Sequence, residues 1–485
     1  MKRLLLLFFI TAIPLAGIHA QASFRADERF ELTSIAARLA GYGEYMQTPL
    51  YGYGKAIDEY FAPYREHGLI SHLRSIRRSN GISYDAIPTA ARALVLKDGG
   101  VSISPEADME KLYEVDSRWT ETNFKEFVRL LDDFYRKSDF HGFYEDNLQF
   151  YAEGEALVNS FAEVDTAWFR SYYGKPLKSP ELYLSFVNGP SNYAITDSGI
   201  SPGFGIVMGM WFDPAYYTAE NISVQQKCAF THIIIHELSH NFTNPLSYEY
   251  KKQMAPASNR VFFEDDVMRA MFNMAYGEPS VMTGEWLNNL CVNMYFREKG
   301  LLYPQDYGKS VSEEADVYGY MAFIDAYKGF FWMNSSIEMM DKFYANRDKY
   351  QYFKDFMPEL VKFYDKFSKN IRKEREKYEA LYPKVTDFSA DTSESDVIEL
   401  KFTFSCPMNP RFVPSGLLPL EGDAMPLPEI MSARYEGDNV LVVRLDKDAL
   451  EKGGTYGGAL DAMSFRSDRA YVMMSGNYQF EFKYE

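Results

Sequence analysis

The pattern of hydrophobic and polar positions divides the chain into helical and strand-like parts. In residues 31–97 and 123–161, apolar residues recur at intervals of three and four, which predicts amphipathic helices. Residues 182–187 and 205–210 are short apolar runs beside turns rich in glycine and proline, and they predict two strands. The helical pattern returns in residues 317–382. The chain up to that point is therefore expected to be mainly helical, with one small sheet.

The pattern changes again near the C-terminal end. Residues 387–396 are polar and predict a linker. Apolar and polar residues then alternate in residues 398–405 and 478–484, and residues 440–445 form another strand-like run. Short strands separated by turn signals predict a β-sandwich. The expected fold class is α+β, with a mainly helical domain at 21–384 and a β-sandwich domain at 385–485.

The first 20 residues predict a secretory signal peptide. Met1-Lys2-Arg3 is positively charged, residues 4–18 are apolar, and small residues follow. The apolar run is too short for a comfortable transmembrane helix, and no later stretch predicts one. The protein is therefore expected to be exported, to the periplasm or the medium, without an integral membrane segment.

Charge and cysteine content narrow the classes of partner and fold. The formal net charge of −17 opposes binding to phosphate backbones, so nucleic acid is not an expected partner. Three cysteines are too few for a disulfide scaffold. We expect Cys228, Cys291 and Cys406 to be small buried residues, with a bridge between Cys228 and Cys291 as the alternative.

A long helix is predicted between residues 223 and 245. Residues 223–226 have the Ser-x-x-Gln form of a capping box, and Asn244-Pro245 is expected to end the helix. The β-branched run at 233–235 favours a strand locally, but boundary signals at both ends favour a helix.

This helix contains His236-Glu237-Leu238-Ser239-His240, the His-Glu-x-x-His pattern of zinc sites. Histidines four residues apart share one helix face and can bind one ion. Zinc lowers the pKa of a bound water to about 7, and a neighbouring carboxylate such as Glu237 can take its proton. His232 lies one turn earlier, but because a catalytic zinc keeps one position for water, we expect a packed or outer-sphere histidine there.

A third zinc ligand must come from elsewhere in the chain. No histidine follows His240, so the ligand is an acid or an upstream histidine. We expect Glu285, because it lies on a mostly apolar helix face where a carboxylate is costly unless it is paired or binds a metal. Alternatively, Glu285 forms a salt bridge, and the third ligand is Glu278 or an acid of the cluster 264–266.

Two further features of a peptide-cleaving site can be sought in the sequence. A strand before the zinc helix could bind an extended peptide through backbone hydrogen bonds. A tyrosine could stabilise the oxyanion, and Tyr193, Tyr318 and Tyr320 are possible choices.

These motifs resemble known families. His236-Glu237-x-x-His240 with the later helical Glu285 looks like the gluzincin plan of zinc metallopeptidases, which implies that Glu237 is the general base and Glu285 the third ligand. Nearly the whole chain after residue 20 is similar to a family of exported Bacteroides-type proteins known as a domain of unknown function. That similarity is carried by residues 31–41, 236–242 and 344–350 and by the Glu285 helix.

A second resemblance concerns the C-terminal domain. A short motif there, Phe404-Ser405-Cys406-Pro407-Met408, resembles a motif of the bacterial immunoglobulin-like domains that are appended to secreted enzymes. The resemblance implies an immunoglobulin-like sandwich without a catalytic role.

The expected function is that of a zinc metallopeptidase that acts on a peptide or protein substrate, with Zn²⁺ as its cofactor. His236, His240 and Glu285 would bind the ion, and Glu237 would act on water. Two alternatives remain open. One is a protein with a silent zinc site that binds peptide or glycan, and the other is a zinc hydrolase of a non-peptide amide or ester.

Overall fold

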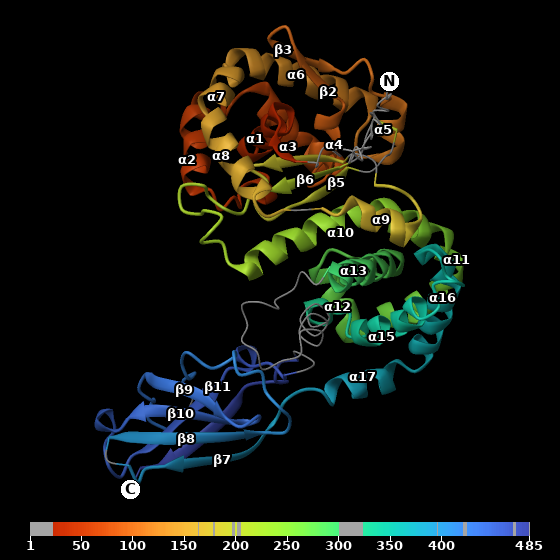
Figure 1. The fold of residues 1–485 in the computed structure, drawn as a ribbon. Helices are drawn as coiled ribbons and strands as arrows, with labels where there is room; N and C mark the ends of the chain where they lie inside the picture. The colour runs from red at the N-terminus through yellow and green to blue at the C-terminus, as the bar shows by residue number, and fades with distance from the viewer. Residues whose placement is uncertain are drawn as a thin grey trace, which may run out of the picture.

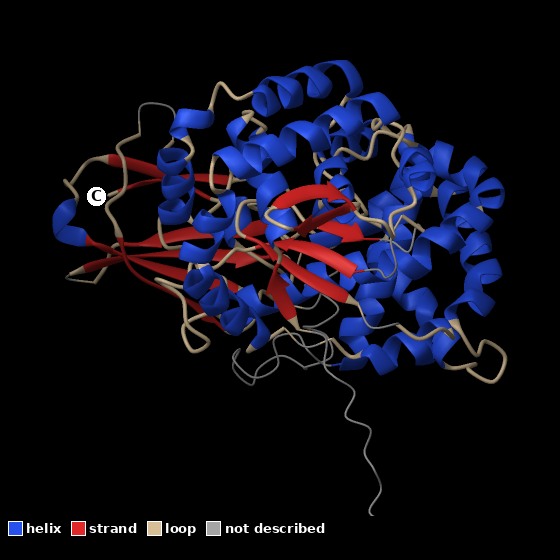
Figure 2. Cartoon of the chain, turned by 90° about the horizontal axis from the view of Figure 1, so that it is seen from above, coloured by secondary structure: helices blue, strands red, loops and turns tan. Residues whose placement is uncertain are grey.

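The computed structural model describes residues 23–484, except 163, 178–179, 196–198, 201–204, 300–323, 395, 421–423 and 469–471. The fold is α+β, as predicted, with helices over most of the chain and a strand-rich part at its C-terminal end (Figure 1; Figure 2, around the label C). The expected signal peptide at 1–20 and the candidates Tyr318 and Tyr320 lie outside the described residues.

The N-terminal part consists of helices with one hairpin. The predicted helices in 31–97 are confirmed, except that the last four residues form the first strand of that hairpin. The second predicted segment contains three helices instead of the expected two. The left-handed φ of 49° at Asp139 separates the first from the second, and Asn147 separates the second from the third. The elements are α1 (Glu28–Leu39), α2 (Tyr51–Tyr60), α3 (Gly68–Asn80), α4 (Ala86–Arg92), β2 (Leu94–Lys97), β3 (Gly100–Ile103), α5 (Met109–Val115), α6 (Glu121–Lys137), α7 (Phe140–Asp146), α8 (Leu148–Asn159) and α9 (Thr166–Tyr173).

A four-stranded sheet lies between the helices α1–α8 and the helix α10, at Val224–Glu249 (Figure 1). Its order is β1 (Phe24–Ala26), β4 (Glu181–Ser185), β6 (Gly205–Gly209) and β5 (Tyr193–Ile195). Both predicted strands are confirmed as β4 and β6. The first three strands are parallel, whereas β5 runs antiparallel to β6 and forms one edge.

The helix α10 (Val224–Glu249) follows the sheet and packs against β5 and β6. Its start is as predicted, because the Ser223 and Gln226 side chains form a reciprocal capping box. Its predicted end is wrong, since the helix continues through Pro245. Proline removes one backbone hydrogen bond, but Phe242 and Leu246 on either side of it pack against the core and hold the last turns in place.

The middle of the chain is helical. Of the segment predicted as helical at 317–382, the described part is helical over most of its length. The acidic cluster 264–266 does not reach the histidines, because Glu264 and Asp266 pair with Arg375 at 3.1 and 2.8 Å. The elements are α11 (Lys251–Phe262), α12 (Asp265–Asn273), α13 (Pro279–Lys299), α15 (Met333–Tyr344), α16 (Phe353–Lys369) and α17 (Ile371–Glu379).

The C-terminal part is an antiparallel β-module with a hydrophobic core of its own. Its four-stranded sheet has the order β7 (Val385–Asp391), β8 (Val397–Phe404), β10 (Val440–Asp446) and β9 (Ile430–Glu436), and β11 (Thr455–Leu460) pairs with β12 (Tyr478–Lys483). The prediction of a linker at 387–396 is wrong for residues 387–391, which belong to β7. Phe388 packs on Phe402 and Phe480, and this contact holds an otherwise polar edge strand on the sheet.

All three cysteines are free. Cys228 and Cys291 are buried and Cys406 is partly buried, so the alternative of a bridge between the first two is wrong. Within the described ranges, no helix has both the length and the apolar character needed to cross a bilayer.

A fully buried acid, Glu31 on α1, joins the helices to the sheet. Its Oε1 accepts the Phe186 backbone N–H at 2.7 Å, and its Oε2 accepts the Tyr53 hydroxyl at 3.0 Å. Burial raises the pKa of Glu31 from 4.5 to about 7, against the effect of these hydrogen bonds. The folded protein therefore keeps a proton on Glu31 over a pH range in which the unfolded chain has lost it.

This shift predicts a pH-dependent loss of stability. The contribution of protonated Glu31 is fully present below about pH 4.5 and is lost as the pH rises through about 7. Between pH 5 and 8, the wild type should lose up to about 3 kcal/mol more unfolding free energy than Glu31→Gln. Urea unfolding at both pH values measures this, with the exposed Glu59→Gln as the control. An equal pH dependence in wild type and Glu31→Gln would contradict the prediction.

Candidate metal centre

Two helices bring the predicted metal ligands together. His236 and His240 lie on one face of α10, and Glu285 extends toward them from α13. The two histidine Nε2 atoms are 3.1 Å apart. Glu285 Oε2 is 3.4 Å from His236 Nε2, and its Oε1 is 3.7 Å from His240 Nε2. One ligand atom from each residue lies within 4.8 Å of the others, so this group could hold a metal ion.

These spacings fit a small tetrahedral ion. Zinc binds nitrogen and carboxylate oxygen at about 2.0–2.2 Å, so tetrahedral ligand atoms lie roughly 3.3–3.5 Å apart. The separations of 3.1, 3.4 and 3.7 Å lie close to that value, although the last two are measured to different oxygens of Glu285. Two imidazoles and one carboxylate leave a fourth position for water, which is the donor set of catalytic zinc sites.

Two asparagines orient the histidine rings. His236 Nδ1 lies 2.9 Å from Asn289 Oδ1, and His240 Nδ1 lies 3.1 Å from Asn244 Oδ1. An amide oxygen accepts hydrogen bonds, so each Nδ1 donates its proton to an asparagine, and each Nε2 would be free to present a lone pair to a bound metal ion. Such outer partners fix the tautomer that a metal needs. Neither asparagine was predicted from the sequence, although Asn244 is four residues after His240 and Asn289 is four after Glu285.

Further polar contacts hold α10 and α13 in register. Asn288 Nδ2 donates to the His236 carbonyl at 3.0 Å, and Thr243 Oγ1 donates to Asn288 Oδ1 at 2.7 Å. Deeper in the protein, Asn293 Nδ2 donates to Asp325 Oδ2 at 2.7 Å. These side chains are buried, so a loss of the bond from Thr243 would leave Asn288 Oδ1 without a partner, and a loss of the bond from Asn293 would do the same to Asp325 Oδ2.

The charges of the three donors complement one another. Burial alone would raise the pKa of Glu285, but its hydrogen bond to His236 and the charges of both histidines bring it down to about 2. The same contact raises the pKa of His236 against the opposing effect of burial. Burial and the charge of His236 lower the pKa of His240 to about 4. Glu285 is thus an ionised carboxylate in a buried place, as a metal ligand must be.

Glu237 lies beside this group. Burial raises its pKa to about 7, and the charge of Glu285 acts in the same direction. The Ala194 backbone forms a hydrogen bond with its carboxylate, which connects Glu237 to the edge strand β5. A carboxylate with a pKa near neutrality can both accept and return a proton.

Several other candidates lie elsewhere. His232 packs against Phe296 with ring centroids 5.9 Å apart, and burial lowers its pKa well below the usual value, which agrees with the expectation of a packed histidine. Tyr193, on β5, is buried beside Tyr45. Glu278 lies outside the three-residue group, although it lines a cavity that reaches Glu285.

One tyrosine at the site was not predicted. The Tyr276 hydroxyl lies beside the Glu285 carboxylate, and burial and the charge of Glu285 raise the pKa of Tyr276. Tyr276 lies between α12 and α13, and nothing in its local sequence distinguishes it from the other 36 of the 37 tyrosines. It is a positioning residue for Glu285.

Comparison of the chain with models of known protein families, with curated proteins and with solved structures found no match. The family resemblances drawn from motifs therefore stay predictions, and any assignment of chemistry rests on the site itself.

The geometry predicts that each chain binds one metal ion. Glu285→Ala removes a charged ligand, so the zinc affinity of this variant should be more than about 100-fold lower than that of the wild type. Removal of a residue that only orients a ligand costs less, ~10–100-fold. Elemental analysis and titration with a chromogenic chelator measure this. Glu278→Ala, an acid nearby on the cavity wall, is the matched control and should bind like the wild type. Equal zinc affinity in both variants would exclude Glu285 as a ligand.

The asparagine contact predicts a second, smaller effect. Asn289→Ala leaves His236 Nδ1 without its acceptor and should weaken zinc binding by about 10–100-fold. Asn289→Asp keeps an acceptor oxygen at the same place and should bind zinc at least ~10 times more tightly than Asn289→Ala. If both variants bind zinc like the wild type, Asn289 does not orient the ligand.

Proposed function

We propose that the protein is an exported, zinc-dependent metallopeptidase. The observation that carries this proposal is the meeting of His236, His240 and Glu285, with one ligand atom of each within 4.8 Å of the others, beside Glu237, a largely buried carboxylate whose pKa lies near 7. The pattern provides three donors, an open position and a base, which are the parts that metal-assisted hydrolysis of an amide requires.

In this proposal each residue has one task. A bound zinc ion would act as a Lewis acid and lower the pKa of water. His236, His240 and Glu285 would hold it, and Tyr276 beside Glu285 would keep that carboxylate in place. Glu237 accepts a proton from the water that attacks the carbonyl carbon. When the carbon–nitrogen bond breaks, Glu237 returns that proton to the leaving amine.

The edge strand β5 supports a peptide as the substrate. Among the described strands, β5 pairs only with β6, and Ala194 at its centre contacts Glu237. An extended peptide that paired with such an edge would pass beside the base. Backbone pairing recognises peptides as a class, whereas a non-peptide amide or ester would gain nothing from it.

The finer features of the fold belong to the same proposal. A histidine-bearing helix packed against a sheet with an antiparallel edge supports a zincin-like domain at 21–384 with the gluzincin plan. Antiparallel sheets that share one core support an immunoglobulin-like domain at 385–485.

The test separates an active enzyme from a binding protein with a silent zinc site. Glu237→Gln removes the base but keeps a side chain of the same shape, so hydrolysis of a mixed peptide library should fall at least ~100-fold, within the range for loss of a general base. Mass spectrometry of the products measures cleavage, and elemental analysis should show unchanged zinc. The exposed Glu249→Gln, on the same helix, is the control.

Unchanged cleavage in Glu237→Gln would contradict the assigned base. A wild-type protein that binds zinc and retains peptides without cutting any of them would favour the silent binding protein.

A further inference from the structure

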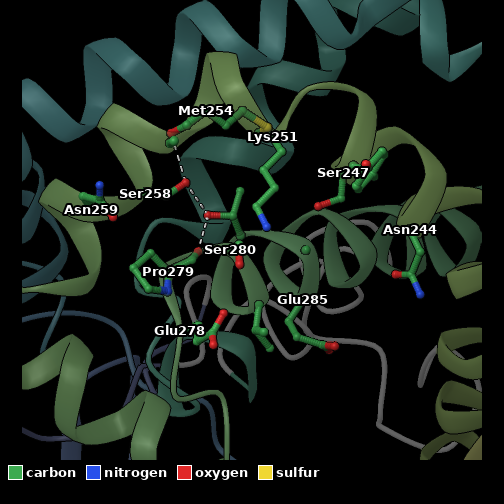
Figure 3. A pocket seen from close by; sticks show the side chains of 15 residues that line it. Asn244, Ser247, Lys251, Met254, Ser258, Asn259, Glu278, Pro279, Ser280 and Glu285 are labelled. Carbon is green, nitrogen blue, oxygen red and sulfur yellow. Dashed lines mark hydrogen bonds between the residues drawn. The ribbon is translucent and has the colours of Figure 1, made fainter. Parts of the chain in front are cut away.

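A cavity of about 540 Å³ opens next to the metal centre, between α10, α11 and the start of α13 (Figure 3). Two of its lining residues belong to the site, because Glu285 is a donor and Asn244 holds the ring of His240. Its volume lies within the ~300–1,000 Å³ of small-molecule sites. If the proposed function holds, the part of the substrate on one side of the cleaved bond enters this cavity.

The floor of the cavity is neutral and its polar groups are already paired. Met254, Ser258 and Thr283 are buried there. Thr283 and Ser258 hydroxyls bond to each other at 2.6 Å, and Ser258 also donates to the Met254 carbonyl at 3.0 Å (Figure 3, dashed lines). The floor therefore has no unpaired group to select a ligand, and selection must come from the walls.

Lys251 supplies the positive charge of the lining. It forms no ion pair with any residue in the described part of the chain, and its side chain extends from α11 into the cavity toward the first turn of α13 (Figure 3). An ammonium group without a partner, in a cavity that receives substrate, is a recognition group for an anion. Peptides carry one kind of anion, the carboxylate.

The position of Lys251 sets the distance from the cleaved bond. Lys251 begins α11, the helix that follows α10, so the path from His240 to Lys251 is helical apart from the junction at Tyr250. At ~1.5 Å per residue, Lys251 lies at most roughly 16 Å from His240 along this path. The side chain of Lys251 shortens this gap, and an extended peptide covers ~3.3 Å per residue. A carboxylate two or three residues from the cleaved bond would meet Lys251.

We propose that this cavity binds a carboxylate of the peptide substrate through Lys251, so that the enzyme prefers peptides with a carboxylate two or three residues from the cleaved bond. The carboxylate can be the C-terminus of a short peptide or an Asp or Glu side chain. Glu278 also lines the cavity and has no ion pair with a described residue. Its charge repels a carboxylate placed beside it, so the substrate carboxylate is directed to the side of the cavity where Lys251 lies.

The experiment uses the zinc-loaded protein and peptides in matched sets. In one set, the two peptides differ only in carrying Glu or Gln at the same position. In the other set, they differ only in having a free or an amidated C-terminus. The wild type should favour the carboxylate member of at least one set in kcat/KM. Lys251→Met should lower kcat/KM for that member about tenfold, as expected for loss of a charge-assisted hydrogen bond, and change the neutral member less than about twofold. Lys251→Arg should retain the preference, and Glu278→Gln should keep or increase it.

A binding measurement makes the test independent of turnover. In the Glu237→Gln background, calorimetry should show the same preference for the carboxylate peptide, and its loss on adding Lys251→Met. Dependence on the free C-terminus identifies the terminal carboxylate, and dependence on Glu identifies the side chain. Equal affinity for both members of every set, or no effect of Lys251→Met on the ratio, overturns the proposal. Selective binding without cleavage by the wild type supports the cavity and contradicts the proposed peptidase.

Discussion

The packing of α10 against α13 is the contact on which the rest of the site depends. Neither helix carries a complete set of donors, because both histidines are on α10 and the carboxylate is on α13. Their alignment is set by buried amides rather than by apolar side chains alone, since Asn288 and Thr243 bond across the interface. Apolar contacts tolerate sliding, whereas a buried hydrogen bond loses most of its value when its partners shift. The asparagines therefore give this interface one register.

Negative charge accumulates near this interface. Asp325 is buried there and Glu237 and Glu285 are largely buried, and burial alone raises the pKa of each. The two histidines offset part of this charge. A divalent cation offsets more of it, and it favours the ionised form of every carboxylate around it. The same arrangement that makes the interior unfavourable for acids makes it favourable for a metal.

Spacing along the chain was enough to predict the three residues that the structure brings together, whereas the residues that position them depend on packing. His236, His240 and Glu285 could be chosen because helical periodicity and the cost of burying a carboxylate restrict the possibilities. Tyr276 could not be chosen, since its role depends on where the connection between α12 and α13 lies in space. Asn244 and Asn289 each follow one of the three site residues by four positions, but this spacing is common in helices. Their role could be predicted only if the position of the facing helix were already known.

Boundary errors have the same origin. The local signal of Pro245 predicted a helix end, and packing of the residues around it prevailed. The polar composition of residues 387–391 predicted a linker, and one aromatic contact through Phe388 was enough to make a strand of it. Local preferences of this kind amount to a few kcal/mol at most, so a modest buried surface can reverse them.

The passage of α10 through Pro245 has a mechanical consequence. Proline has no N–H to give to the Asn241 carbonyl, so the helix lacks one bond between the turn that carries His240 and the turn that carries Ser247 and Tyr248. The two histidines lie before this point, and Ser247 and Tyr248 of the cavity lining lie after it. The packing of Phe242 and Leu246 against the core therefore has to do what the missing hydrogen bond cannot, which is to fix the cavity wall relative to the histidines.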